Sequence, residues 1–159
     1  MPNIVSNTTP IISLLKIGKL EFLEKIYGEI LIPREVFNEI QKGKDKPYYA
    51  DISQLHWITI KDIGDKKALN YFVDLDAGEA EVIVLASELE ADLVIIDETL
   101  GRRFAKHSGL KVTGTIGVLI KAKEMGLINK ISPLLDDLQR RGIWISDKLI
   151  KNILKIVKE

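Results

Sequence analysis

The sequence predicts an α/β fold, in which helices cover a central, mostly parallel sheet. In the segment Asp92–Glu98, four consecutive apolar residues are bracketed by acids, as expected of a strand buried on both faces of a parallel sheet. Helical segments precede and follow this strand, so the three together form one crossover unit. Ligands of open α/β sheets bind just beyond the carboxyl ends of the strands, where Asp97 stands. We therefore expect the chemistry of the protein near Asp97.

The first part of the chain reads as strand, two helices, strand and helix. Asn7–Pro10 has the side-chain cap and the early proline of a helix start, so the first strand ends at Asn7. Pro33 opens a later helix, which turns apolar residues toward the core and carries Glu39 beside them. The expected elements are the strands 4–6 and 30–32, the helices 11–17 and 20–27 with Gly18 between them, and a helix from Pro33 to Ile40.

The middle of the chain holds its most loop-like segment. Residues 41–49 are rich in Lys, Gly, Asp and Pro, which is typical of a surface excursion. The alternation of apolar and polar residues in Trp57–Ile60 predicts a third strand at the edge of the sheet. Asp76 and Glu79 have the spacing of a capping box at the start of a helix. If the flanking strands close correctly, the carboxylates of Glu79 and Asp97 face one cleft.

The last part of the chain is predicted to hold a short strand and four helices. Thr115 is expected to cap one of these helices, which Gly126 ends. The apolar stripe of the final helix packs on the sheet of its own domain or forms a dimer or partner surface. The elements are the helices 98–107 and 115–125, the strand 111–113, and helices that start at Ser132 and Ser146; the stripe is Leu149, Ile150, Ile153, Leu154 and Val157.

Size and composition set broad limits on the function. The length of 159 residues suits one domain, which we place at residues 1–159. Lys+Arg and Asp+Glu both total 23, so no global field attracts nucleic acid or an anionic membrane. The absence of cysteine excludes disulfides, thiolate metal sites and a cysteine nucleophile. No apolar run is long enough for a membrane span, so we expect a soluble, cytoplasmic protein without a membrane partner.

Several weak motifs occur in one specific order along the chain. In this order and spacing, the chain resembles the PIN-domain nucleases, especially the prokaryotic predicted nucleic-acid-binding PIN proteins related to VapC-like toxins. The resemblance runs from about Ile4 to Leu127, and it implies a three-layer α/β/α fold whose central sheet has about four to five strands. The motifs are Asn7-Thr8-Thr9-Pro10, Ile32-Pro33 followed by Val36-Phe-Asn-Glu39, Gly78-Glu79-Ala80-Glu81, Ile96-Asp97-Glu98, Gly101-Arg102 and Lys111 to Leu119.

The resemblance also implies a metal-dependent ribonuclease site made of acids. In the family, these acids stand at the end of strand one, in the helix after strand two, at the start of the helix before strand four, and at the end of strand four. The corresponding residues here are Asn7, Glu39, Glu79 and Asp97, with the last three expected to be catalytic and all four to bind Mg²⁺ or Mn²⁺. Asn7 departs from the family, which has Asp at this position.

The chemistry explains why such a site uses acids. Mg²⁺ and Mn²⁺ prefer hard oxygen ligands, bridge a phosphate oxygen and lower the pKa of bound water, so that hydroxide can attack phosphorus. Asn7 offers a neutral carbonyl oxygen in place of a carboxylate, which keeps the shape of the ligand and loses one negative charge. Metal affinity should therefore fall.

Each of these residues also has an ordinary structural interpretation. Asp97 can cap the helix that follows it, Glu79 can complete the capping box, and Glu39 can lie on an exposed helix face. For Asn7, a helix cap or local turn is as reasonable as contact with a metal or its water. Glu98 is expected to be solvated.

Basic and hydroxyl side chains near the acids are candidates for substrate binding. Arg102 and Lys106 lie one helical turn apart beside Asp97, where they can contact RNA phosphates or form a solvated basic face. Thr9 can orient the metal shell through its hydroxyl or cap the first helix.

Three functions remain in view. The first is a metal-dependent endoribonuclease that hydrolyses RNA phosphodiester bonds, in one version the toxin of a toxin–antitoxin pair with an antitoxin partner; a homodimer follows from the resemblance. The second is a PIN domain weakened by Asn7, which binds RNA or protein without efficient turnover. The third is a receiver-like signalling domain, against which Asn7 and the strand Trp57–Ile60 argue because they offer neither its acidic cluster nor its phosphoacceptor.

Overall fold

The computed structural model describes residues 3–159 and contains a five-stranded, all-parallel sheet with the strand order β3-β2-β1-β4-β5. The central strand β1 (Ile4–Ser6) pairs with β2 (Ile30–Pro33) on one side and with β4 (Leu93–Ile95) on the other. The outer strands are β3 (Ile58–Lys61) and β5 (Val112–Thr113). The predicted α/β fold class, with its parallel sheet and its number of strands, is confirmed.

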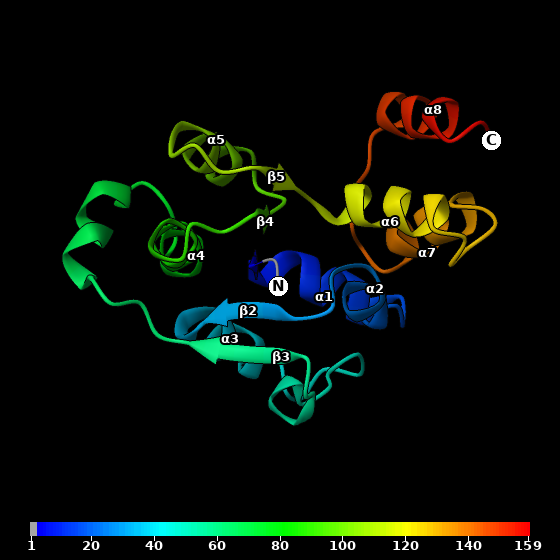
Figure 1. Cartoon of the computed structure of the whole chain (residues 1–159). Helices are drawn as coiled ribbons and strands as arrows, with labels where there is room; N and C mark the ends of the chain where they lie inside the picture. The colour runs from blue at the N-terminus through cyan, green and yellow to red at the C-terminus, as the bar shows by residue number, and fades with distance from the viewer. Residues whose placement is uncertain (1–2) are drawn as a thin grey trace.

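Helices lie on both sides of the sheet, as the predicted three-layer arrangement requires (Figure 1). α4 (Ala77–Glu88) contacts β1, β2 and β4 from one side, while α2 (Glu21–Tyr27) and α6 (Thr115–Glu124) contact each other on the other side. Within residues 3–159, we find no helix whose length and hydropathy would let it cross a membrane. The remaining helical elements are α1 (Thr8–Lys16), α3 (Arg34–Gln41), α5 (Thr99–His107), α7 (Ser132–Arg140), α8 (Asp147–Ile156) and the short 3₁₀ segments η1 (Ile52–Gln54) and η2 (Lys66–Phe72).

The core explains the uninterrupted apolar run that follows Asp92. Val94, Ile95 and Ile96 have no exposed surface, because β4 lies between two paired strands and under helices. The core continues through both helical layers and includes the predicted core residues Val36 and Ile40 of α3. The sheet therefore fixes the position of the chain on either side of β4.

The register of the sheet brings the ends of β1 and β4 side by side. Ser6 pairs with Ile95, and the backbone N–H of Asn7 donates to the carbonyl oxygen of Ile95 at 2.9 Å. The chain segments after Ser6 and after Ile95 consequently leave the sheet at the same edge. This edge is where the candidate residues Asn7 and Asp97 stand.

Of the two capping predictions, that for Asn7 is right in its position but wrong in its hydrogen bond, and that for Thr115 is wrong. Asn7 directly precedes α1, but its side chain makes no capping hydrogen bond, and Thr115 is the first residue of α6 rather than its cap, a position that Gly114 takes. The reason is the same in both cases: each side chain bonds to an acid after β4, Asn7 to Glu98 and Thr115 to Asp97. Tertiary contacts across the sheet edge therefore replace the local caps.

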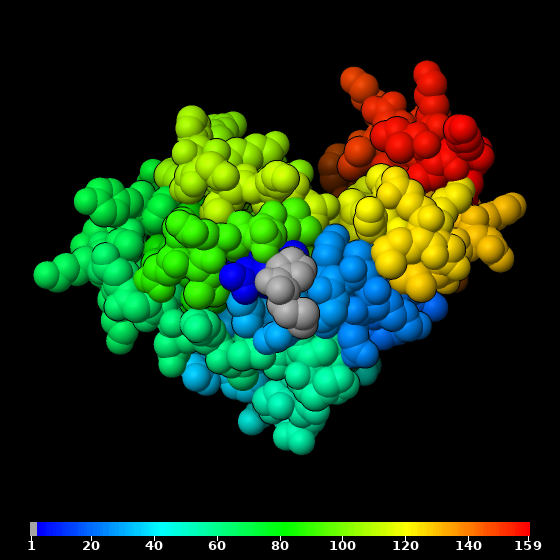
Figure 2. Space-filling model, viewed as in Figure 1, coloured from blue at the N-terminus to red at the C-terminus, as the bar shows by residue number. Residues whose placement is uncertain are grey.

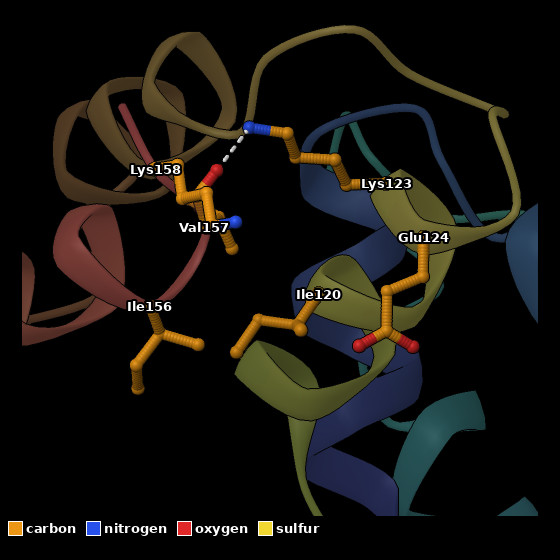
Figure 3. Close-up of a pocket in the computed structure, with 6 residues that line it drawn as sticks. All are labelled: Ile120, Lys123, Glu124, Ile156, Val157 and Lys158. Carbon is orange, nitrogen blue, oxygen red and sulfur yellow. Dashed lines mark hydrogen bonds between the residues drawn. The ribbon is translucent and has the colours of Figure 1, made fainter.

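Both apolar and polar contacts attach α8 to the rest of the molecule. Ile153 is buried in the core, and the amine of Lys123 on α6 donates to the carbonyl oxygen of Val157 at 2.7 Å (Figure 3). The Glu159 carboxylate accepts hydrogen bonds from Lys123 Nζ at 2.8 Å and from the backbone N–H of Ile131 at 2.7 Å. Leu149 of the predicted apolar stripe remains 44% exposed.

Candidate functional site

Polar side chains from several elements meet at the edge where β1 and β4 end. Hydrogen bonds link them: the Thr8 hydroxyl donates to Glu39 Oε2, and the Asn7 amide Nδ2 donates to Glu98 Oε2 at 3.1 Å. The two residues that follow β1 thus hold one carboxylate from α3 and one from the start of α5. The residues of the site are Asn7, Thr8, Thr9, Glu39, Glu79, Asp97 and Glu98.

Glu39 lies on α3 and is partly buried against α4. A Cβ atom at Gly78 would lie only 2.8 Å from Glu39 Oε2, so the absence of a side chain at Gly78 allows α4 to approach this closely. Burial raises the pKa of Glu39, and the negative charges of Asp76 and Glu35 act in the same direction, against the hydrogen bond from Thr8. The surroundings of Glu39 therefore shift the balance from its charged toward its neutral form, and a nearby cation would oppose that shift.

Glu79 stands in the first turn of α4 and is 7% exposed. The Asp76 carboxylate accepts the backbone N–H of Glu79 at 2.8 Å, so the predicted start of this helix is correct. Burial, together with Asp76 and the charges of Glu98 and Glu39, raises the pKa of Glu79 to about 8. A carboxyl with this pKa carries a proton at neutral pH unless a positive charge is placed beside it.

The Asp97 side chain links the end of β4 to the start of α6 through hydrogen bonds. Its Oδ1 accepts the backbone N–H of Thr115 at 2.7 Å, and its Oδ2 accepts the Thr115 hydroxyl at 2.6 Å. Burial raises the pKa of Asp97, while these two hydrogen bonds oppose the rise. Asp97 therefore caps a helix, as the structural interpretation allowed, but this helix is α6 and not the helix that follows Asp97 in sequence.

The side-chain oxygen of Asn7, Oδ1, is the atom of the site that most needs a hydrogen-bond donor or a cation. The residue is 2% exposed, and its Oδ1 is buried without a hydrogen-bond partner within residues 3–159. Leaving a buried polar atom unpaired costs about 1–3 kcal/mol. Because Nδ2 of the same amide is held by Glu98, the amide cannot turn to satisfy Oδ1 without breaking that bond. A donor or a cation at Oδ1 would remove this cost.

Glu98 is a residue of the site that the sequence led us to expect in solvent. Its carboxylate instead accepts hydrogen bonds from Asn7 Nδ2 and from the Thr9 hydroxyl, so both oxygens are engaged by the segment after β1. Its charge also contributes to the raised pKa values of Glu79 and Asp97. One signal in the sequence could have identified Glu98: it directly follows Asp97. We gave more weight to the expectation that an acid at the start of a helix is solvated.

Arg102, a predicted substrate-binding residue, lies beside the end of β4. Its guanidinium donates to the carbonyl oxygen of Ile96 at 3.0 Å, which fixes it beside the end of β4. Arg102, Arg103, Lys106 and Thr99 line a shallow cavity of about 280 Å³ on α5. Positive charge on α5 thus lies next to Asp97, whose pKa the charge of Arg102 acts to lower.

A PIN-domain family model, DUF3368, matches residues 3–159. The chain belongs to the PIN-domain family. The match extends from the start of β1 past the end of α8, so it covers every element of the described structure. PIN domains have a nuclease-type fold and are generally metal-dependent nucleases of RNA or DNA. A search of curated proteins and a search of solved structures gave no match.

The residues of this PIN domain suit a hard divalent cation by their chemistry. Three carboxyl groups and an amide oxygen that has no partner in the described part of the chain offer the all-oxygen donors that such ions prefer. Among residues 3–159, no three His, Cys, Asp or Glu side chains form a ready-made metal group. The fit to a cation therefore rests on the type of donor and on the buried Oδ1 of Asn7.

Proposed function

We propose that this PIN domain is a Mg²⁺- or Mn²⁺-dependent endoribonuclease that hydrolyses RNA phosphodiester bonds. The observation that carries the proposal is the buried amide of Asn7: its nitrogen donates to Glu98, and its oxygen has no hydrogen-bond partner among the residues that the structure describes. In this proposal Asn7, Glu39, Glu79 and Asp97 hold the metal, and the three acids among them are the catalytic residues.

The carboxyl groups supply the charge that such a site needs. Glu39, Glu79 and Asp97 all have raised pKa values, chiefly because of burial, so a cation beside them is favoured over three neighbouring anions. A bound Mg²⁺ or Mn²⁺ would polarise a phosphate oxygen and acidify water. Thr115 holds Asp97 in one orientation through two hydrogen bonds, and Thr8 does the same for Glu39 through one.

Glu98 compensates for the charge that is missing at Asn7. Its carboxylate lies against the Asn7 amide, so the negative charge is one side chain away from where the resemblance places an aspartate. Thr9 donates to the same carboxylate and positions it. Thr9, Arg102 and Lys106 form the substrate-binding side of the site in this proposal, with the two basic residues on RNA phosphates.

In its narrower form, the proposal makes the protein the toxin of a toxin–antitoxin pair. It would then act on cytoplasmic RNA as a homodimer, and an antitoxin protein would bind and silence it. A neighbouring small gene for a DNA-binding protein would support this narrower form.

A second candidate function is a PIN domain that binds RNA or protein without efficient turnover. Two observations favour it: Asn7 is neutral, and both oxygens of Asp97 already accept hydrogen bonds from Thr115. In that case the acid at the end of β4 acts mainly as a connector between β4 and α6.

Cleavage of RNA separates the two candidates. A mixed panel of single-stranded and structured RNAs is incubated with Mn²⁺ or Mg²⁺ and wild type, Asp97→Asn, Glu79→Gln or the control Asp45→Asn, which changes an exposed acid of the loop after α3. We expect wild type and the control to cleave, and the cleavage rate of both site variants to fall by at least about 10- to 100-fold.

Thermal melts establish that the site variants are folded, which matters because Asp97 also anchors α6. Cleavage by wild type that Glu79→Gln and Asp97→Asn leave unchanged contradicts the proposed site. If wild type leaves all RNAs intact while Asn7→Asp cleaves them, the binding module is the correct function.

A further inference from the structure

Three adjoining cavities, which we together call the groove, lie between the segment that joins α7 to α8 and the basic side chains of α5. A cavity of about 290 Å³ is lined by Thr9, Asp97, Trp144 and Leu149, and a second cavity of about 420 Å³ has Asp97 and Leu149 in its wall as well. The second cavity shares Arg102 with the shallow basic cavity on α5. Figure 2 shows the surface hollowed between α5 and α8. The groove thus runs from Trp144 past Asp97 to Arg102.

Trp144 is the most exposed large apolar side chain of the described residues, at 84%. Its neighbour Ile145 is only 6% exposed, and the Gln139 side chain donates to the carbonyl oxygen of Ile145 at 3.1 Å. The backbone that carries Trp144 is therefore anchored in the fold, while the indole ring itself faces solvent. Exposed aromatic rings on anchored backbone are typical of binding sites, because the ring loses little conformational freedom on binding.

The order of side chains along the groove matches one strand of nucleic acid. The end at Trp144 is aromatic and apolar, with Ile143 and Leu149 beside it, the centre holds Asp97, and the far end is basic. Proteins bind single strands by stacking bases on aromatic rings and by placing cations on phosphates. The bases of a duplex are already stacked and paired, so they gain little binding energy from an aromatic ring beside the groove.

We propose that Trp144 is a nucleobase-stacking residue, which binds an unpaired base of the RNA next to the phosphate at the acids. This inference rests on the proposed function. Leu149 and Ile143 would form the apolar floor under the base, while Arg102 and Lys106 hold the phosphates on the other side of Asp97. The groove then positions a single strand across the site.

Binding measurements test this subsite without cleavage. Fluorescence anisotropy of a labelled single-stranded oligoribonucleotide of mixed sequence, and of its duplex, is recorded in Ca²⁺ for wild type, Trp144→Ala, Trp144→Phe and Tyr71→Ala. Tyr71 is an equally exposed ring, at 80%, and is the matched control. We expect Trp144→Ala to weaken single-strand binding about tenfold, Trp144→Phe to keep most of it, and the control and the duplex to show no change.

Indole emission gives a second readout. The chain has two tryptophans, and Trp57 is only 8% exposed, so quenching by the single strand should disappear in Trp144→Phe. Equal single-strand binding by wild type and Trp144→Ala overturns the inference, and wild-type cleavage would then leave the proposed function intact. Binding that depends on Trp144 without cleavage by wild type supports the inference and overturns the nuclease. Wild type that binds no single-stranded RNA overturns both.

Discussion

Asn7 shows how one atom changes the site. An amide can donate through Nδ2 to Glu98 and still offer Oδ1 to a ligand, whereas a carboxylate at the same position can only accept. Asn7 and Glu98 therefore belong together: the amide allows a carboxylate to lie 3.1 Å away without repulsion. The neutral residue and the additional acid are two parts of one arrangement.

Replacing Asn7 with Asp should expose this relation. In Asn7→Asp, the new carboxylate faces Glu98 without a proton between them, so the metal-free protein should melt lower, by about 3 °C for each kcal/mol lost. Mn²⁺ affinity should rise about tenfold, which corresponds to about 1.4 kcal/mol. Thermal melts and calorimetric titration with Mn²⁺ measure the two effects.

A change at Glu98, the hydrogen-bond partner of residue 7, supplies the control for this prediction. Adding Glu98→Gln to Asn7→Asp should restore the melting temperature, because the amide can again donate. Asn129→Asp makes the same change at an exposed position and should alter neither quantity. A metal-free Asn7→Asp protein as stable as wild type would show that Glu98 does not bond to residue 7 in solution.

Glu79 makes stability depend on pH. Its pKa is raised from 4.5 to about 8 in the fold, so its contribution to stability is complete below the unfolded pKa and is lost as the pH rises toward about 8. The metal-free wild type should therefore melt progressively lower across this range, by several degrees. In Glu79→Gln, the melting temperature should not show this part of the decline with pH. The control Glu21→Gln, which changes an exposed acid on α2, should show the same decline as wild type.

Melting curves recorded across this pH range, with and without Mn²⁺, check the prediction. Mn²⁺ should raise the melting temperature of wild type most at the alkaline end, where Glu79 has lost its proton. Identical pH profiles for wild type and Glu79→Gln would mean that the carboxyl titrates normally.

At the scale of elements, glycines set how closely helices approach the acids. A Cβ at Gly101 would lie 2.9 Å from Glu79 Oε2, and a Cβ at Gly114 would lie 2.5 Å from Asp97 Oδ1. Together with Gly78 beside Glu39, each of the three acids has one glycine of a neighbouring helix or helix start against it. Close approach explains these glycines, since none of the three has a positive φ.

Helices α6, α7 and α8 are joined by the carboxylate of Glu159. It accepts hydrogen bonds from Lys123 on α6 and from the backbone N–H groups of Ile131 and Ser132 at the start of α7. Burial acts to raise the pKa of Glu159, but these hydrogen bonds outweigh it and lower the pKa to about 2. The stability that this group contributes is present above its ordinary pKa of 4.5 and is lost as the pH falls toward about 2.

Removing this charge should loosen α8. Glu159→Gln should melt a few degrees lower than wild type at neutral pH, and the difference should shrink as the pH falls through the range just given. Glu124→Gln, which changes an exposed acid of α6, is the control and should melt like wild type. Circular dichroism melts check the prediction, and a pH-independent difference would contradict the role of the charge.

At the scale of the whole molecule, the sequence predicted the elements better than the contacts between them. The apolar run before Asp97 and the capping spacing of Asp76 and Glu79 are local signals, and both placed their elements correctly. The bonds of Asp97 to Thr115 and of Glu98 to Asn7 depend on which chain ends meet at the sheet edge. Local patterns carry no such information, so the sequence indicated neither the bond of Asp97 to the start of α6 nor the engagement of Glu98, which was expected in solvent.

The same limit applies to the groove. Trp144 comes near the site only because the segment after α7 folds back toward the sheet edge, where it shares a cavity with Thr9 and Asp97. In sequence it stands far from every acid of the site. A tryptophan between Ile143 and Ile145 reads as an ordinary apolar residue, so the local sequence gave no sign of that proximity.

The parallel sheet also has a consequence for how the protein is made. Every pairing in it joins distant segments, and the central pair brings Ile4 against Leu93. Because loop closure precedes the gain from such contacts, a sheet of this kind folds slowly, and the acids come together only as these long-range pairings form. A growing chain on the ribosome therefore lacks the assembled site until β4 and β5 have been synthesised and docked.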